Sequence, residues 1–414
     1  MAALALTAPA RAEDRSFDLA SRETLTVAAD LRLTATDGEP SWTQGGFGKL
    51  RFGGAESGEL RARSALGEAA LVWQPRLSWA LSGTVVGVVQ GGSRTEAGLS
   101  EAFLTFKPLG DGAVRISARA GLMWPPVSLE HAGPEWAVTD TITPSAINSW
   151  IGEEVKVVAA EGSARVRLGG QTLTATAAVF DLNDTAGALL AFRGWGLHDR
   201  VALAFRRQPL PPLNEFMEYV QPRYSHPLLD ADGGVLRRPG YYVKLAWDLP
   251  LPLHLEALHY DNDGDPEAVL PTLEWGWRTR FDDVGFIAEP ASGWQLRGQA
   301  LAGRTEMGPV MDGRRWIDMR FRAAYALLTR HFATGSLSAR VDVFGTRNRG
   351  TAVTGEADES GWAATIAARR KLTAQLSAVV EYLHVESRRE AREDAGLAAQ
   401  QTQNQVQLAM RMRL

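Results

Sequence analysis

Apolar and polar residues alternate with a period of two along most of this chain. Between residues 23 and 36, apolar residues such as Leu25 and Val27 occupy one face and Thr24 lies on the other. Residues 405–414 alternate in the same way and finish on an apolar position. Successive side chains of a strand point to opposite faces, so this period predicts β-strands with one apolar face.

The alternation predicts about eighteen strands of roughly 9–14 residues, the length that a tilted strand needs to cross a membrane. Merging the weakest pairs would give sixteen. An open sheet of this size would leave two unpaired edges, so closure into a barrel is favoured. The predicted strands lie near residues 23–36, 60–73, 77–89, 99–107, 114–122, 153–168, 173–181, 189–192, 201–206, 241–247, 252–261, 271–281, 292–304, 315–328, 335–345, 360–370, 374–386 and 405–414.

The connections between the predicted strands differ in length on the two sides of the sheet. The mostly short ones fall on one side, at 74–75, 108–112, 169–171, 194–199, 249–252 and 371–373. The longer inserts fall on the other side, at 37–59, 125–152, 208–239, 347–359 and 387–400. Short turns on one side and long loops on the other are typical of outer-membrane barrels. We therefore expect an all-β, transmembrane, antiparallel up-and-down barrel of 16–18 strands, whose short turns face the periplasm.

The polar face of many predicted strands carries arginine. Arg278 and Arg280 alternate with Phe281, and Arg320 alternates with residues such as Phe321. We expect these arginines to face a wet lumen and their apolar neighbours to face lipid. Aromatic residues near strand ends would suit interfacial girdles, although they would equally fill a core. They are Trp73, Trp124, Trp247, Trp294, Trp362, Tyr241 and Tyr260.

The insert at 125–152 separates two clear strands and contains no Lys or Arg. We expect it to be the third extracellular loop, folded inward as a constriction. Its acids could face wall arginines across the pore, such as Arg115, Arg119, Arg165 and Arg167, or Glu130 and the prolines could merely fix the exit of the loop. The candidate constriction and lumen residues are Arg115, Arg119, Glu130, His131, Glu135, Asp140, Glu153, Lys156, Arg165 and Arg167.

Composition narrows the class of protein. The 414 residues contain no apolar run near the roughly 20 that a spanning helix needs. A net charge of −4 argues against a nucleic-acid partner. The absence of cysteine fits an envelope protein without requiring one. Residues 1–12 are predicted to be the remnant of a secretory signal peptide, leaving 13–414 as a single barrel domain.

The segment Pro125–Glu130 resembles the proline-rich segment that leads into the pore loop of the phosphate-selective porin O/P-like family. The runs 142–154 and 192–195 are similar to those of porin-like outer-membrane proteins of alphaproteobacteria. The resemblance implies passive diffusion of small hydrophilic solutes or ions through a barrel with an internal constriction. Phosphate selectivity does not carry over, because an anion filter needs cations at its narrowest point and the insert has none.

No catalytic, cofactor or metal motif is predicted. The seven histidines are scattered, and no nucleophile elbow or phosphate loop is present. Expected partners are outer-membrane lipids and lipopolysaccharide, small solutes, the barrel-assembly machinery through the C-terminal strand, and two further copies in a possible homo-trimer. Two alternatives remain: a non-channel outer-membrane or secreted β-protein with a binding or structural role, and an outer-membrane lipase-type enzyme.

Overall fold

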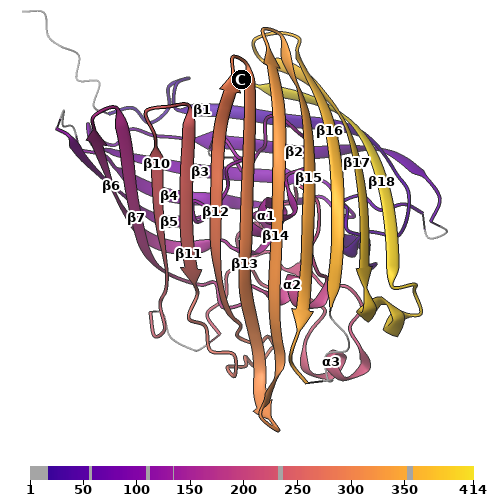
Figure 1. The fold of residues 1–414 in the computed structure, drawn as a ribbon. Helices are drawn as coiled ribbons and strands as arrows, with labels where there is room; N and C mark the ends of the chain where they lie inside the picture. Colours follow the sequence, from indigo (N-terminus) through magenta and orange to yellow (C-terminus); the bar gives the residue numbers. More distant parts are fainter. Residues whose placement is uncertain (1–16, 56–57, 109–111, 134, 232–235, 352–357) are drawn as a thin grey trace, which may run out of the picture.

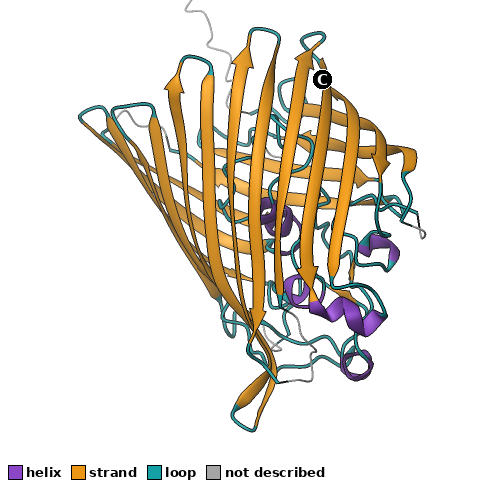
Figure 2. Ribbon diagram, turned by 45° about the vertical axis from the view of Figure 1, so that its right-hand side comes forward, coloured by secondary structure: helices purple, strands orange, loops and turns teal. Residues whose placement is uncertain are grey.

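A computed structural model describes residues 17–55, 58–108, 112–133, 135–231, 236–351 and 358–414. In these residues, 16 strands form a closed antiparallel barrel (Figures 1 and 2). The predicted signal remnant, residues 1–12, lies outside the described residues. The barrel strands are β1 (Leu25–Thr36), β2 (Arg61–Trp73), β3 (Leu81–Gln90), β4 (Glu96–Phe106), β5 (Val114–Met123), β6 (Val157–Leu168), β7 (Gln171–Asp181), β10 (Gly240–Asp248), β11 (Leu253–Asp261), β12 (Arg278–Ala291), β13 (Trp294–Met311), β14 (Arg314–Phe332), β15 (Gly335–Asn348), β16 (Glu359–Lys371), β17 (Leu376–Arg389) and β18 (Gln400–Arg413).

The first and last barrel strands close the sheet. Residues 28–36 of β1 pair with residues 405–413 of β18, and the other edge of β1 pairs with β2. Every barrel strand therefore has two hydrogen-bonded neighbours, which removes the open edges that an extended sheet would carry.

The remaining elements belong to the connections. They are the helices α1 (Ala146–Glu154), α2 (Ala188–Phe192) and α3 (Glu215–Val220), the small sheet of β8 (Gln208–Pro209) and β9 (Tyr224–Ser225), and two 3-10 helices, Trp42–Gln44 and Glu390–Ala395. None of the helices in the described residues is long and apolar enough to cross a membrane.

The prediction of about eighteen strands is wrong by two. Residues 189–192 lie in helix α2, and residues 201–206 form no strand. Leu190 and Leu203 are both fully buried inside the barrel. An apolar segment that is covered on all sides shows no clear period, so alternation could not distinguish it from a strand. The predicted turn at 194–199 consequently lies within the long connection between β7 and β10.

The two ends of the barrel differ as the loop lengths indicate. The short turns and the C-terminus lie at one end, which is at the top of Figure 1, and the longer connections lie at the other. Two connections at the loop end are short, residues 91–95 between β3 and β4 and residues 312–313 between β13 and β14. The long strands β13 and β14 meet there at Asp312 and Gly313, whose φ angles of 51° and 77° suit a two-residue hairpin turn. This hairpin extends beyond its neighbours (Figures 1 and 2).

The outer wall is apolar over the middle of the strands. Exposed side chains there include Val341, Val343, Ile366, Val380 and Leu408. Their neighbours in sequence on the same strands, such as Asp342 and Gln407, are buried in the interior. This arrangement is that of a strand with lipid on one side and protein or water on the other.

Near the loop end of β12–β14 the predicted facing was wrong. Phe281, Met319 and Phe321 are at most 2% exposed and lie in the interior. Arg320 and Arg322 lie on the outside instead. The reason is that packed connections, and not water, fill the barrel at this level, so the inner wall is apolar.

The aromatic residues divide between the two environments. Trp73, Trp247 and Trp294 are 37–42% exposed on the outside, as a girdle requires. Trp124 and Tyr260 are at most 4% exposed and belong to the core inside the barrel. Of the two alternatives left open for the aromatic residues, these two therefore follow the second, in which they fill a core.

Candidate functional site

The connection between β5 and β6, residues 124–156, passes through the inside of the barrel. It contains helix α1, whose N-cap Ser145 accepts a hydrogen bond from the backbone N–H of Asn148. On α1, the fully buried Trp150 makes edge contacts with Phe281 of β12 at 5.5 Å and Phe321 of β14 at 5.2 Å between ring centroids. The apolar inner wall at this level thus serves to hold α1.

Two charged wall residues hold the bend that precedes α1. Glu381 of β17 accepts hydrogen bonds from the backbone N–H groups of Ile142 and Thr143. Arg340 of β15 donates to the carbonyl oxygens of Thr143 at 2.7 Å and Pro144 at 2.9 Å. Both side chains are fully buried. The bend is therefore fixed to the wall through backbone groups that would otherwise lack partners.

Three acids of the connection, Glu130, Glu135 and Asp140, each pair with a wall arginine. Glu130 lies 3.2 Å from Arg340 and Asp140 lies 3.1 Å from Arg297, while Glu135 pairs with Arg413. The predicted partners on β5 and β6 are not used. The connection crosses the interior from β5 and reaches the strands β13, β15 and β18, so its acids lie far along the wall from where it begins.

His131 and Glu130 also organise the connection itself. Glu130 accepts hydrogen bonds from the backbone N–H of Ser145 at 2.9 Å and from the Asn148 side chain at 2.6 Å. The His131 ring stacks on Trp136 at 3.9 Å, and its Nδ1 lies 2.6 Å from the hydroxyl of Ser128. These contacts agree with the simpler alternative in which Glu130 fixes the local path of the chain.

The predicted arginines of β5 and β6 line the opposite side of the interior. Arg119 makes two hydrogen bonds of 2.7 Å to Glu161. Arg115 is directly opposite Arg165 in the strand register, and Arg165 lies 4.0 Å from Asp248. Arg115, Arg165 and Arg167 are exposed, so this part of the inner wall is accessible to water.

Glu153, near the end of α1, and Lys156, just after it, are both fully buried. Glu153 contacts Arg193 and lies 2.9 Å from Nε2 of His198. Burial by itself would raise the pKa of Glu153, but Arg193 and His198 lower it below its usual value. The Lys156 ammonium lies 3.9 Å from the centre of the Trp124 ring and donates to the carbonyl oxygen of Ala202. These two residues hold connections together and do not face open space.

A second inward connection, residues 37–55, meets the β7–β10 connection inside the barrel. Asp199 pairs with Arg32 of β1 and with Arg51 at 2.8 Å, and Lys49 pairs with Glu359 of β16. Burial opposes ionisation of Asp199, but the two arginines lower its pKa below the usual value. The loop half of the barrel is therefore filled by buried side chains of the connections.

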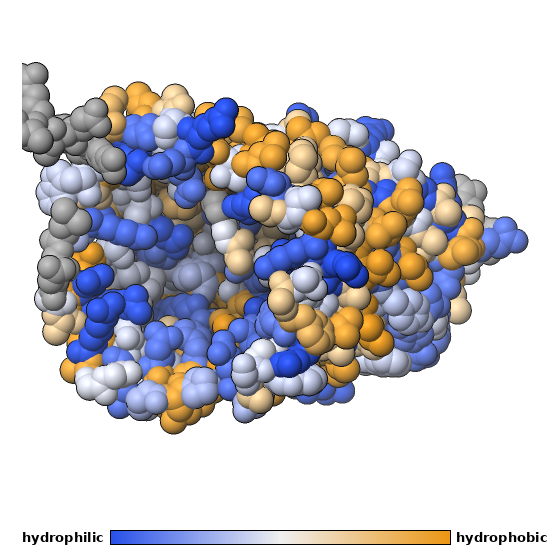
Figure 3. All heavy atoms as spheres, turned by 90° about the horizontal axis from the view of Figure 1, so that it is seen from above, coloured by the Kyte–Doolittle hydropathy of each residue, from blue (hydrophilic) through white to orange (hydrophobic). Residues whose placement is uncertain are grey.

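The turn half of the barrel is open. Seen from the end with the short turns, the molecule is hollowed, and the hollow is lined mainly by hydrophilic residues (Figure 3). A cavity of about 250 Å³ lies between the β5–β6 connection and the strands β1 and β18. Its lining includes Asp30, Arg32, His131, Glu135 and Arg411.

Glu154 supplies a pH-dependent contribution to the packing of this interior. Its carboxylate accepts hydrogen bonds from Trp150 Nε1 at 2.7 Å and from the backbone N–H of Leu189 at 2.9 Å. Burial raises the pKa of Glu154 to about 7. The folded protein therefore holds more protons than the unfolded chain between about pH 4.5 and pH 7, and stability falls as the pH rises through this window.

We expect Glu154→Gln to remove this dependence. The amide carries no charge, so the loss of stability between pH 4 and pH 8 should be smaller in the variant than in the native protein by on the order of 1–3 kcal/mol. The amide oxygen can accept only one of the two hydrogen bonds, which lowers the stability of the variant by the same amount at both pH values. Urea unfolding in lipid vesicles at both pH values measures the difference. The exposed Glu59→Gln is the control, and an identical pH effect in the two variants would contradict the assignment.

Sequence reasoning missed the wall residues that hold the bend. Arg340 and Asp342 share a face with Ser336 and Ser338 on β15, and this uniformly polar face was a usable signal for the interior. Glu381 has no such signal, because Val379 and Leu383 on its own face are apolar.

Comparisons with known proteins support the fold. No protein-family model matches the chain, and no curated protein matches it. Among solved structures, it is similar to the channel DcaP of Acinetobacter baumannii, with a TM-score of 0.55, 10% identity, and coverage of 95% of this chain and 99% of that one. The anion-selective porin of Comamonas acidovorans gives a TM-score of 0.53, 11% identity, and coverage of 94% and 99%.

A third match is OmpTdeltaL8, a loop-deletion mutant of OmpT, an outer membrane protein of Vibrio cholerae, with a TM-score of 0.51, 8% identity, and coverage of 94% and 99%. Identities this low establish the fold only. A closed antiparallel barrel with an apolar outer wall satisfies its backbone groups in lipid without open edges. The chain thus has the fold of outer-membrane porins and channels.

Proposed function

We propose that this protein is an outer-membrane porin through which small hydrophilic solutes or ions diffuse passively, with residues 125–152 as its constriction. The proposal rests mainly on one contrast between the two walls. The inner wall of the turn half is charged and accessible to water, while the outer wall at the same level is apolar. A barrel built this way has a polar lumen and a lipid-facing exterior.

The paired acids of the constriction support a preference for anions. Glu130, Glu135 and Asp140 each have an arginine partner on the wall, so they leave little net negative charge. Arg115 and Arg167 on the opposite wall are exposed. The uncompensated charge that a solute meets in the turn half is therefore positive.

Planar-bilayer recording tests the proposed channel. Purified protein should give discrete conductance steps, and in a KCl gradient the reversal potential should show a weak preference for chloride. A protein that inserts and gives no steps contradicts the porin function.

The double variant Arg165→Gln, Arg167→Gln tests the origin of the selectivity. It should lower the chloride-to-potassium permeability ratio by about twofold or more, because it removes two cations from the water-accessible wall. The control is Arg314→Gln, Arg315→Gln, which makes the same change of charge at the β13–β14 hairpin, outside the lumen. A native preference for cations, or an equal shift in both variants, would argue against the assignment.

A plugged barrel with a binding role is the second candidate. It is favoured by the fully buried Trp42, Trp150 and Trp195, which pack the loop half of the interior. Absence of conductance in the native protein, together with conductance after loosening of the β5–β6 connection, would support it. The predicted homo-trimer and the contact with the assembly machinery stay predictions.

A further inference from the structure

A row of arginines crosses four neighbouring strands on the outside of the barrel. In the strand registers, Arg280 of β12 is opposite Arg304 of β13, and Arg304 is opposite Arg320 of β14. Arg320 is in turn opposite Arg347 of β15. Like charges directly opposite each other destabilise a sheet, so this row calls for negative partners.

Acids of the protein pair with Arg280, Arg304 and Arg347, but the pairs of Arg280 with Glu306 and of Arg347 with Asp358 are long, at 3.8 Å. Arg304 pairs with Asp318 and lies 3.0 Å from Glu306. Within the described ranges, by contrast, no acid pairs with Arg320 or with Arg322. Both side chains are exposed on β14.

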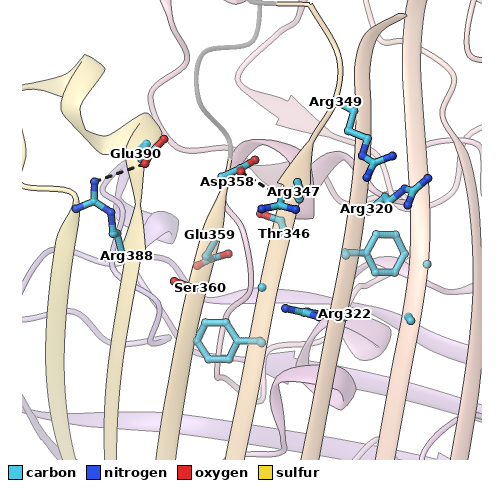
Figure 4. A pocket seen from close by; sticks show the side chains of 15 residues that line it. Arg320, Arg322, Thr346, Arg347, Arg349, Asp358, Glu359, Ser360, Arg388 and Glu390 are labelled. Atoms are coloured by element: carbon cyan, nitrogen blue, oxygen red, sulfur yellow. Dashed lines mark hydrogen bonds and ion pairs between the residues drawn. The ribbon is translucent and has the colours of Figure 1, made fainter.

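The two arginines without acid partners line a hollow of about 590 Å³ on the outer surface. Arg347, Arg349 and Arg388 contribute to the same lining (Figure 4). The ion pairs around the hollow are long: Arg347 lies 3.8 Å from Asp358, and Arg388 lies 3.5 Å from Glu390. Strong charged hydrogen bonds are roughly 2.7–2.9 Å, so these arginines retain capacity for another anion.

An apolar groove adjoins this hollow. It has a volume of about 580 Å³, and Arg322 and Ala302 line both spaces. The rest of its lining is mostly aliphatic and includes Val284, Ala324 and Val343. The outer surface therefore has arginines nearer the loop end and an apolar groove nearer the middle of the strands.

We propose that the arginine hollow and the apolar groove together bind a phosphorylated lipid of the outer leaflet. Its phosphate groups would contact Arg320 and Arg322, and an acyl chain would lie along Val284 and Val343. The planar guanidinium fork matches a phosphate, and several positive groups suit a headgroup with more than one phosphate. This inference rests on the proposed outer-membrane location, with the short turns toward the periplasm.

Lipid binding by the purified full-length protein in detergent tests the proposal. The probes are diphosphorylated lipid A, the same lipid with its phosphates removed, and inorganic phosphate, and native mass spectrometry reports the bound fraction. The native protein should retain diphosphorylated lipid A at least about tenfold better than the dephosphorylated lipid. Arg320→Gln, Arg322→Gln should remove this preference.

Two further variants make the result specific. Arg165→Gln, Arg167→Gln removes the same charge from the inner wall and should bind lipid A as the native protein does. Ala324→Trp fills the groove and should weaken binding of the lipid while leaving the arginines in place.

Each remaining outcome counts against the proposal. Equal retention by native and Arg320→Gln, Arg322→Gln protein would exclude these arginines. Binding of inorganic phosphate as tightly as lipid A would indicate a site for soluble phosphate. If the native protein were oligomeric in lipid-free detergent and the Arg320→Gln, Arg322→Gln variant monomeric, the two arginines would belong to a subunit interface. The lipid-binding experiment does not depend on conductance. A failure of the proposed channel function can therefore be distinguished from a failure of this site.

Discussion

The double variant Arg340→Ala, Glu381→Ala should conduct more current per channel than the native protein, by about twofold or more. Glu381 accepts from the backbone N–H groups of Ile142 and Thr143, and Arg340 donates to the carbonyl oxygens of Thr143 and Pro144. Without these partners, the backbone groups of the bend would be buried and unsatisfied, at a cost of about 1–3 kcal/mol for each group. Moving the bend into water relieves that cost and widens the lumen.

The measurement is single-channel conductance in planar bilayers. Arg370→Ala, Glu386→Ala is a matched control, because it removes the same two types of charge from the outer side of β16 and β17. Folding of each variant is checked by its resistance to unfolding in detergent at room temperature. Native conductance in a folded Arg340→Ala, Glu381→Ala protein would contradict the role of residues 125–152 as a constriction.

Replacing Glu153 with alanine should cost more stability than any exposed ion pair. In the variant, the guanidinium groups of Arg193 and Arg200 would stay buried without the balancing charge of Glu153. Arg200 would keep its ion pair with Glu96 at 2.7 Å. Removing one member of a buried ion pair typically costs about 3–5 kcal/mol. Removing an exposed pair costs about 0–1 kcal/mol. Glu218→Ala, which breaks the exposed pair between Glu218 of α3 and Arg223, is therefore the control.

Urea unfolding in lipid vesicles measures both variants. The pKa of Glu153 is lowered in the folded protein, so its stabilising contribution is fully present above about pH 4.5 and shrinks as the pH falls below it. The difference between native and Glu153→Ala protein should therefore be largest at neutral pH and smaller at pH 3. A difference that does not change between these pH values would show that packing, and not charge, makes Glu153 important.

The arginines of β14 illustrate where alternation misleads. The period of two correctly placed Arg320 and Phe321 on opposite faces of one strand, but it could not say which face was inside. The usual rule assigns polar residues to the lumen, and it fails here because the inner wall at this level contacts Trp150 and other buried groups. Which face of a strand lies inside depends on where the connections pack, and the sequences of the connections follow no regular period.

For the candidate site, the sequence pointed to the acids but not to their partners. Glu130, Glu135 and Asp140 stood out because they lie in an insert without cations, and all three do make ion pairs with the wall. Their partners Arg340, Arg413 and Arg297 come from strands β15, β18 and β13, which are distant in sequence. Only the closure of the barrel brings those strands opposite the β5–β6 connection.

The sequence by itself determined the fold class, the positions of most strands and the difference between a short-turn end and a loop end. These features follow from local patterns: a period of two, turn residues and loop length. Only the folded structure gives the count of 16 strands, the filling of the loop half and the ion pairs of Glu130, Glu135 and Asp140. The physical reason is that an apolar segment such as 189–192 is stabilised equally by a helix or a strand once it is buried, so only packing against distant residues selects between them.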